Sequence, residues 1–193
     1  MPYRLIAALF ALHATAALAD PLAGTIDDPN LRKKVDVVYV EKAEGAFPPP
    51  ATPVAIDQKG FKFLPHLSVF VVGTKAAFHS QDPELHNVYA RLGKGVLFND
   101  AVLPQGHFDR VFGKAGVVHL TCNIHKDMSA WIVVLQNPFF STAIDRGTGA
   151  FTIANVPPGS YTIRVWGEGL SDGENGKTWP VTVGPGAAPL KVR

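Results

Sequence analysis

Hydrophobic and polar residues alternate over short runs of this chain, which is the period-two pattern of half-buried β-strands. The runs are rich in Val, Ile, Thr and aromatic residues, and clusters of Gly and Pro separate them. The pattern predicts strands at 35–41, 66–73, 116–122, 130–136, 149–156, 160–167 and 178–184. Short strands at such spacing are typical of an all-β protein built from β-sandwiches.

One segment carries the signals of a helix instead. In residues 80–93, Asp82 is a suitable N-cap, Pro83 suits the first helical position and Gly93 suits the end. Apolar residues within the segment also recur at helical spacing. Local rules therefore predict a helix here, and His86 lies inside it.

Two proline-containing breaks divide the chain. "FPPPATP" at 47–53 cannot form a central strand, because proline lacks the N–H that a strand needs, and Asn-Pro at 137–138 marks the second break. We expect one domain at 54–136 and a smaller one at 137–193. Residues 20–53 hold N-terminal strands, which either complete the smaller domain or add to the larger one.

The first residues predict export. Residues 1–19 combine basic Arg4, a short apolar run and an Ala17-Leu18-Ala19 cleavage site, which are the marks of a cleaved signal peptide. The apolar run is too short to span a membrane, and no later stretch approaches the necessary length. The expected location is the periplasm, with no membrane span.

The net charge and the absence of certain motifs argue against some classes of function. The formal net charge of +2 gives no reason to expect nucleic acid as a partner. The sequence contains no recognisable serine triad, paired-carboxylate set or phosphate-binding loop, so we do not expect an enzyme.

The single cysteine offers the most specific chemistry. In an oxidising compartment Cys122 has no internal partner, so it is buried and inert, paired between molecules, or used chemically. His125 and Met128 follow it at even spacing in "TCNIHKDMSAW", between two predicted strands. A thiolate, an imidazole and a thioether form a soft ligand set, and a second imidazole would complete a blue-copper centre.

Residues 54–136 resemble a cupredoxin, particularly the short-loop kind typified by amicyanin and pseudoazurin. The resemblance rests on "FKFLP" from Phe61, "VVGT" at 71–74, "HNV" at 86–88, "AGVVHLTC" at 115–122 and the "CNIHKDM" loop. It implies a Greek-key β-sandwich that holds one type 1 copper ion. It also implies that His86 is the fourth ligand and that Asn87 pins the ligand loop by hydrogen bonds. The helix predicted at 80–93 is then wrong at its start, and His86 lies on a loop or at a strand end.

Two alternatives concern the ligands. His79 stands where cupredoxins commonly carry another polar residue, so it is either an extra ligand or a solvated edge residue. Zinc also accepts Cys and His, but methionine is a poor zinc ligand and copper binds such sites more tightly. A closed set of four ligands leaves no position for substrate, which favours electron transfer over catalysis.

Residues 138–193 resemble a carboxypeptidase regulatory-like, transthyretin-like β-sandwich, on the evidence of "GAFTIANVPPGSYTIRVWGEG". Residues 23–45 look like the opening strands that this segment lacks. Chains that combine these two kinds of domain resemble proteins labelled methylamine utilisation protein, which implies a place in electron transfer.

The sequence therefore predicts a periplasmic type 1 copper protein that carries single electrons between redox partners such as a periplasmic dehydrogenase or a cytochrome. A copper-delivery or copper-sensing module would use the same ligands but exchange electrons slowly. A cell-envelope β-sandwich that binds carbohydrate or protein without a redox role would hold no stoichiometric copper.

Overall fold

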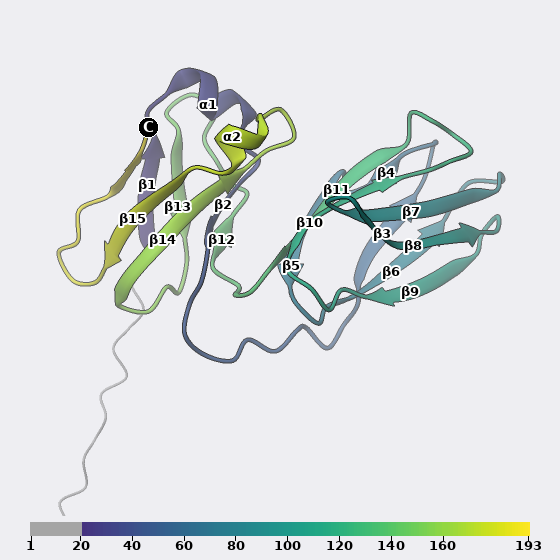
Figure 1. Ribbon diagram of the computed structural model, residues 1–193, viewed down its shortest axis with the longest axis horizontal. Coiled ribbons are helices and arrows are strands. Elements are labelled where there is room, and N and C mark those ends of the chain that lie inside the picture. The colour runs from purple at the N-terminus through teal and green to yellow at the C-terminus, as the bar shows by residue number, and fades with distance from the viewer. Residues whose placement is uncertain (1–20) are drawn as a thin grey trace, which may run out of the picture.

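The computed structural model describes residues 21–193, and the signal peptide predicted for residues 1–19 lies outside this range. The described chain is nearly all strand, with two short helices, α1 (Pro29–Lys34) and α2 (Asp172–Asn175). Its strands form two β-sandwiches that lie side by side (Figure 1). The predicted all-β fold is confirmed. Within the described range, no helix is long and apolar enough to cross a membrane.

The first sandwich is formed by the middle of the chain. One sheet has the strand order β5-β11-β10-β7-β8 and the other has the order β4-β3-β6-β9. Neighbouring strands are antiparallel except for the parallel pairs β5–β11 and β3–β6. The strands are β3 (Val54–Gln58), β4 (Phe63–Leu64), β5 (Leu67–Val71), β6 (Lys75–Ser80), β7 (His86–Leu92), β8 (Gly95–Val102), β9 (His107–Val111), β10 (Gly116–Thr121) and β11 (Ser129–Leu135).

The core of this sandwich follows from strand alternation. In β10, Val118 and Leu120 are fully buried while His119 between them faces the other side of the sheet. The same core cluster includes Cys122 and Met128, the first and last residues of the loop between β10 and β11. Both ends of that loop are therefore anchored in packed side chains.

The second sandwich combines both ends of the described chain. Its sheets have the strand orders β13-β1-β16 and β12-β2-β14-β15. The N-terminal strand β1 pairs with β13 and β16, and β2 pairs with β12 and β14. The strands are β1 (Leu22–Ile26), β2 (Val37–Val40), β12 (Phe140–Ser141), β13 (Ala150–Ile153), β14 (Gly159–Trp166), β15 (Thr178–Val183) and β16 (Leu190–Val192).

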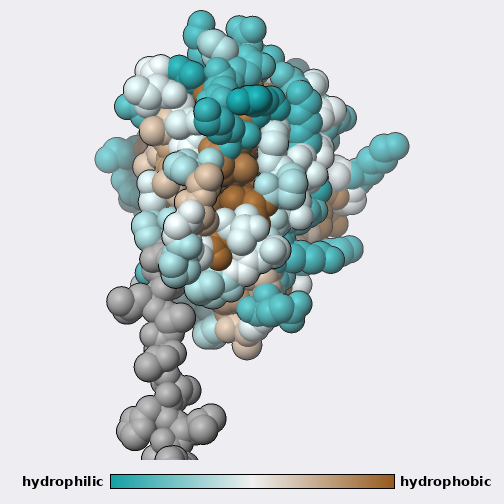
Figure 2. Space-filling view, turned by 90° about the vertical axis from the view of Figure 1, so that its left-hand side faces the viewer, coloured by the Kyte–Doolittle hydropathy of each residue, from teal (hydrophilic) through white to brown (hydrophobic). Residues whose placement is uncertain are grey.

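The two sandwiches pack through the outer faces of one sheet each. Buried Trp166 and Val37 from the second sandwich meet buried Val133 and Leu135 of β11, with half-buried Trp131 beside them. This cluster joins the four-stranded sheet of the second sandwich to the five-stranded sheet of the first. Figure 2 views the far end of the second sandwich, where hydrophilic residues surround a narrow band of hydrophobic ones.

The helix that local rules predict at 80–93 is wrong, because residues 86–92 of this segment form strand β7. His86, Val88 and Ala90 are fully buried in alternation, which requires a strand. Pairing with β8 on one side and β10 on the other outweighs the local helix signals. Asp82 does not cap a helix but accepts hydrogen bonds from another loop.

The sequence pattern does not predict several strands of the first sandwich, notably β8 and β9. Both are edge strands of their sheets. In β8 the consecutive residues Val96 and Leu97 are both exposed, so strict alternation is absent. An edge strand has less of its surface buried, and its sequence is correspondingly less constrained.

Gly167 provides a test of how closely the chain packs around the end of β14. A β-carbon there would clash with the carbonyl oxygen of Lys34 and lie 3.1 Å from the α-carbon of Val35. Because these are backbone atoms, Gly167→Ala should destabilise the protein by about 1–3 kcal/mol. Gly173→Ala is the matched control, since nothing lies within 4 Å of the position that its new methyl group would take. Thermal unfolding should separate the two variants, and equal midpoints would contradict this packing.

Candidate metal centre

The loop between β10 and β11 presents three of the predicted ligands. Cys122 directly follows β10 and Met128 directly precedes β11. The Cys122 N–H donates to the Met128 carbonyl at 3.2 Å, and the Met128 N–H donates to the His125 carbonyl at 3.1 Å. These bonds close the loop tightly, so residues three apart in sequence return to the same end of the sandwich.

His86 reaches this loop from the neighbouring strand. It begins β7, which pairs with β10 so that Tyr89 lies opposite Thr121. One ligand atom each of His86, Cys122 and His125 lies within 4.8 Å of the others. His86 and Cys122 are buried and His125 is half-buried. Within residues 21–193 this is the one group of three or more Cys, His and acidic residues gathered so closely.

Asp82 determines which ring nitrogen of His86 faces His125. Its buried carboxylate accepts from the N–H groups of Gly60 and Phe61 at 2.6 and 3.1 Å, and it lies 2.9 Å from His86 Nε2. Burial raises the pKa of Asp82, but these hydrogen bonds outweigh burial and leave the pKa below 3.8. An ionised carboxylate can only accept, so His86 Nε2 carries the hydrogen. The lone pair of His86 Nδ1 then points at His125 Nδ1, 3.0 Å away.

Asn87 holds the loop from the adjacent position. Its side-chain oxygen accepts from the Asn123 N–H at 2.7 Å and lies 3.3 Å from the Cys122 sulfur. Its amide nitrogen donates to Asn99 on β8. The Cys122 sulfur also receives the His125 N–H at 3.5 Å. These contacts with Asn87 and His125 fix the position of the Cys122 sulfur.

Met128 completes the base of the loop. Its side chain has no exposed surface and belongs to the same buried cluster as Cys122. Its backbone bonds to Cys122 and His125 hold it at the same loop end as these two residues.

Sequence reasoning predicted the role of Asn87 but missed Asp82 and Phe61, which also support these side chains. Phe61 has a positive φ of 58°, and its ring meets the His125 ring edge-on, with ring centroids 4.9 Å apart. The Asp82 carboxylate holds the turn that contains Phe61. An acidic residue four positions before a candidate histidine ligand was the available signal for Asp82.

The donor set fits copper on the chemistry of the residues present. Two imidazoles and a thiol converge, the His86 lone pair is directed inward, and a buried thioether lies in the same loop. Soft sulfur with imidazole suits copper, while zinc would need a better fourth donor than methionine.

The remaining described histidines lie elsewhere. His79 contacts Asp57 at 3.2 Å and is not part of the group around Cys122. His119 stacks on Trp131 with ring centroids 4.0 Å apart. His66 lies between the Ser129 carbonyl at 3.0 Å and the Glu168 carboxylate at 2.7 Å.

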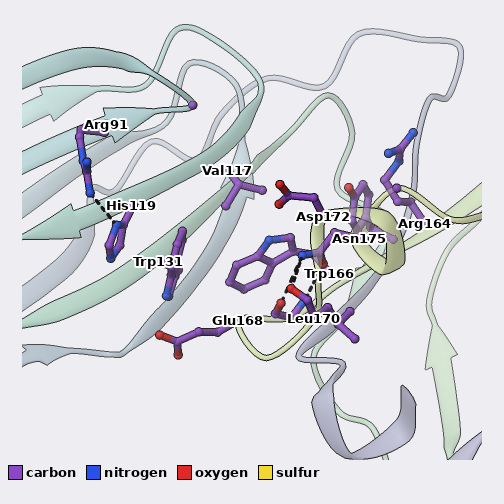
Figure 3. Close-up of a pocket in the computed structure, with 14 residues that line it drawn as sticks. Arg91, Val117, His119, Trp131, Arg164, Trp166, Glu168, Leu170, Asp172 and Asn175 are labelled. Atoms are coloured by element: carbon purple, nitrogen blue, oxygen red, sulfur yellow. Dashed lines mark hydrogen bonds between the residues drawn. The ribbon is translucent and has the colours of Figure 1, made fainter. Parts of the chain in front are cut away.

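His119 and Trp131 line a cleft of about 610 Å³ between the two sandwiches (Figure 3). Arg91 donates toward His119 at 3.2 Å, and His119 contacts the Ser129 hydroxyl at 2.9 Å. Burial, followed by the charge of Arg91, lowers the pKa of His119. On the other wall, Trp166 lies beside Trp131 with ring centroids 5.4 Å apart. Both faces of Trp131 thus have aromatic neighbours, and neither is a free platform for a sugar ring.

Several solved structures resemble part of this chain. A purple cupredoxin from Nitrosopumilus maritimus is 22% identical with a TM-score of 0.38, over 42% of this chain and 98% of that one. Amicyanin from Paracoccus versutus is 18% identical with a TM-score of 0.39, over 50% and 96%. A copper-containing nitrite reductase from Thermus scotoductus is 23% identical with a TM-score of 0.41, over 49% of this chain but only 25% of the enzyme. Identities and TM-scores this low do not transfer a function.

A family model described as polysaccharide lyase family 4, domain II matches residues 122–189. The match covers less than half of the chain and crosses from the first sandwich into the second. No curated protein matches the chain.

Asp82→Asn should weaken this end of the sandwich. The new amide would place N–H groups against two existing donors, Phe61 N–H and His86 Nε2–H, at a cost of about 1–3 kcal/mol. Loss of this support should also weaken metal binding about 10–100-fold. Thermal unfolding and chelator competition would measure the two effects.

The contribution of Asp82 to stability should change with pH in a defined direction. Because the folded protein lowers the pKa of Asp82, its contribution to stability is complete above 3.8 and is lost as pH falls through the lower folded value. The difference in stability between wild type and Asp82→Asn should therefore disappear at acid pH. Asp109→Asn is the matched control, since Asp109 forms only an exposed pair with Lys75 at 3.6 Å. A difference that persists unchanged in acid would contradict the role of Asp82.

Proposed function

We propose that this protein is a periplasmic type 1 copper protein that carries single electrons between redox partners. The observation that carries the proposal is the convergence of His86, Cys122 and His125 within 4.8 Å. These three would be the equatorial ligands of one copper ion, and Met128 would be the weak axial ligand. The location rests on the signal peptide predicted for residues 1–19.

Copper in such a site supplies a one-electron couple. The residues of this chain hold the donors in place, so that little has to move when the charge of the site changes. Asp82 orients the His86 ring, and Asn87 ties the Cys122 end of the loop to β7. Burial of Cys122 and His86 keeps water from both donors. Four protein ligands would leave no open position for a substrate, which supports a carrier rather than an enzyme.

The surface beside the histidines supports contact with a partner protein. Phe61, Leu85 and Ile124 are 47%, 43% and 49% exposed. Phe61 touches both histidines of the cluster, while Leu85 and Ile124 precede His86 and His125. Half-buried His125 is the ligand nearest this apolar surface and would be the point of electron entry and exit. A periplasmic dehydrogenase or a cytochrome would suit such a surface.

Cys122→Ser tests the ligand set directly. The wild-type protein, reconstituted with copper, should hold one ion per chain and show an intense visible thiolate-to-copper band. The variant should lose the band, because serine oxygen is a poor replacement for the thiolate. Metal analysis and a visible spectrum are the measurements. His119→Gln is the control, because His119 lies on the strand that leads to Cys122 but faces the opposite side of the sheet. An unchanged spectrum in Cys122→Ser would refute the assignment.

Met128→Leu separates the axial ligand from the equatorial ones. This variant should still bind copper, and its reduction potential should rise because the thioether donor is lost. Voltammetry would measure the potential, and stopped-flow reduction would distinguish a carrier from a slowly exchanging delivery module. A potential equal to that of wild type would count against Met128.

A further inference from the structure

A second group of side chains of the types that bind metals lies on the sheet that contains β3, β6 and β9. Asp57 of β3 lies opposite His79 of β6, and His79 lies opposite His107 of β9. Residues directly opposite on adjacent strands project from the same face, with β-carbons roughly 5 Å apart. The three side chains thus form one row across three strands, and none of them belongs to the group around Cys122.

Asp57 orients the ring of His79. Its carboxylate lies 3.2 Å from His79 Nδ1, and its other oxygen accepts from the Gln81 side chain at 3.0 Å. Because an ionised carboxylate only accepts, Nδ1 carries the hydrogen and the Nε2 lone pair of the neutral ring is left free. Metal-binding histidines are commonly oriented by such a carboxylate on the opposite nitrogen.

His107 supplies a second imidazole at chelating distance. The ring centroids of His79 and His107 are 5.9 Å apart and the rings are tilted by 40°. Metal–nitrogen bonds of about 2.0–2.1 Å bring two such rings to roughly 5 Å, so a small side-chain rotation is enough. His107 is exposed on an edge strand, which leaves it free to rotate.

The surroundings leave room for water ligands. On the same face, the next positions of β3 and β6 are the small residues Ala55 and Ala77. Asp109, the next residue on that face of β9, is engaged by Lys75 at 3.6 Å. On the side toward Ala55 and Ala77, the His79–His107 pair therefore lacks a bulky neighbour along β3 and β6.

We propose that His79 and His107 form a surface site for a divalent transition metal of the kind that imidazole prefers, such as Zn²⁺ or Cu²⁺. His79 binds through Nε2, His107 through one ring nitrogen, and water completes the coordination. Asp57 is a positioning residue rather than a ligand. This site does not depend on the proposed function, because it shares no residue with the cluster of His86, Cys122 and His125.

Zinc titration of the Cys122→Ser/His125→Gln protein tests the proposal, since these changes disable the buried cluster. Calorimetry should detect one Zn²⁺ per chain. Adding His107→Gln should abolish that binding, and adding Asp57→Asn should weaken it about 10–100-fold. His66→Gln is the matched control, because His66 is an exposed histidine paired with Glu168 outside the row. It should change nothing.

Imidazole resonances in NMR spectra identify the ligands independently of affinity. Zn²⁺ should shift the ring signals of His79 and His107 and leave those of His66 in place, while circular dichroism confirms that each variant is folded. Absence of zinc binding in the background protein would overturn the proposal, as would binding that survives His107→Gln. An affinity unchanged by Asp57→Asn would overturn the positioning role.

Discussion

The hydrogen bond between Asp82 and His86 is the interaction on which the candidate metal centre depends. It places the hydrogen of the buried ring on Nε2, which directs the Nδ1 lone pair toward His125 at 3.0 Å. A buried lone pair needs a positive partner, and an N–H group or a metal ion can fill that role. The same carboxylate holds the turn of Phe61, so one buried charge sets both the direction of a ligand and the cover over the site.

Strand pairing connects the Asp82–His86 contact to the rest of the first sandwich. β7 and β10 are neighbours, so His86 and Cys122 arrive at the same end of the sheet from positions far apart in sequence. Asn87 then bridges the two strands through the Asn123 N–H. In Figure 1 the start of β7 and the loop between β10 and β11 lie toward the right-hand end, away from the second sandwich. The exposed apolar residues beside the histidines therefore remain accessible.

The second sandwich contacts the first through both apolar and hydrogen-bonding residues. Trp166 and Trp131 supply an apolar centre, and His66 links the Ser129 carbonyl to Glu168. The hydrogen bond with His66 holds the pKa of Glu168 below its usual range. Ser129 directly follows Met128, so the base of the candidate ligand loop and the second sandwich are connected by two hydrogen-bond steps. The attachment thus fixes the outer face of the five-stranded sheet without covering the loop.

The sequence by itself determined the strand content and the local part of the candidate site. Alternation predicts strands such as β10 and β11, and the even spacing of Cys122, His125 and Met128 within one tight loop brings them together through short-range geometry. Tertiary structure decided the rest. His86 lies in a strand rather than a helix because pairing with β8 and β10 overrides local propensity. The Asp82 contact and the row of Asp57, His79 and His107 depend on which strands become neighbours and in what register, and no local pattern in the chain encodes that information.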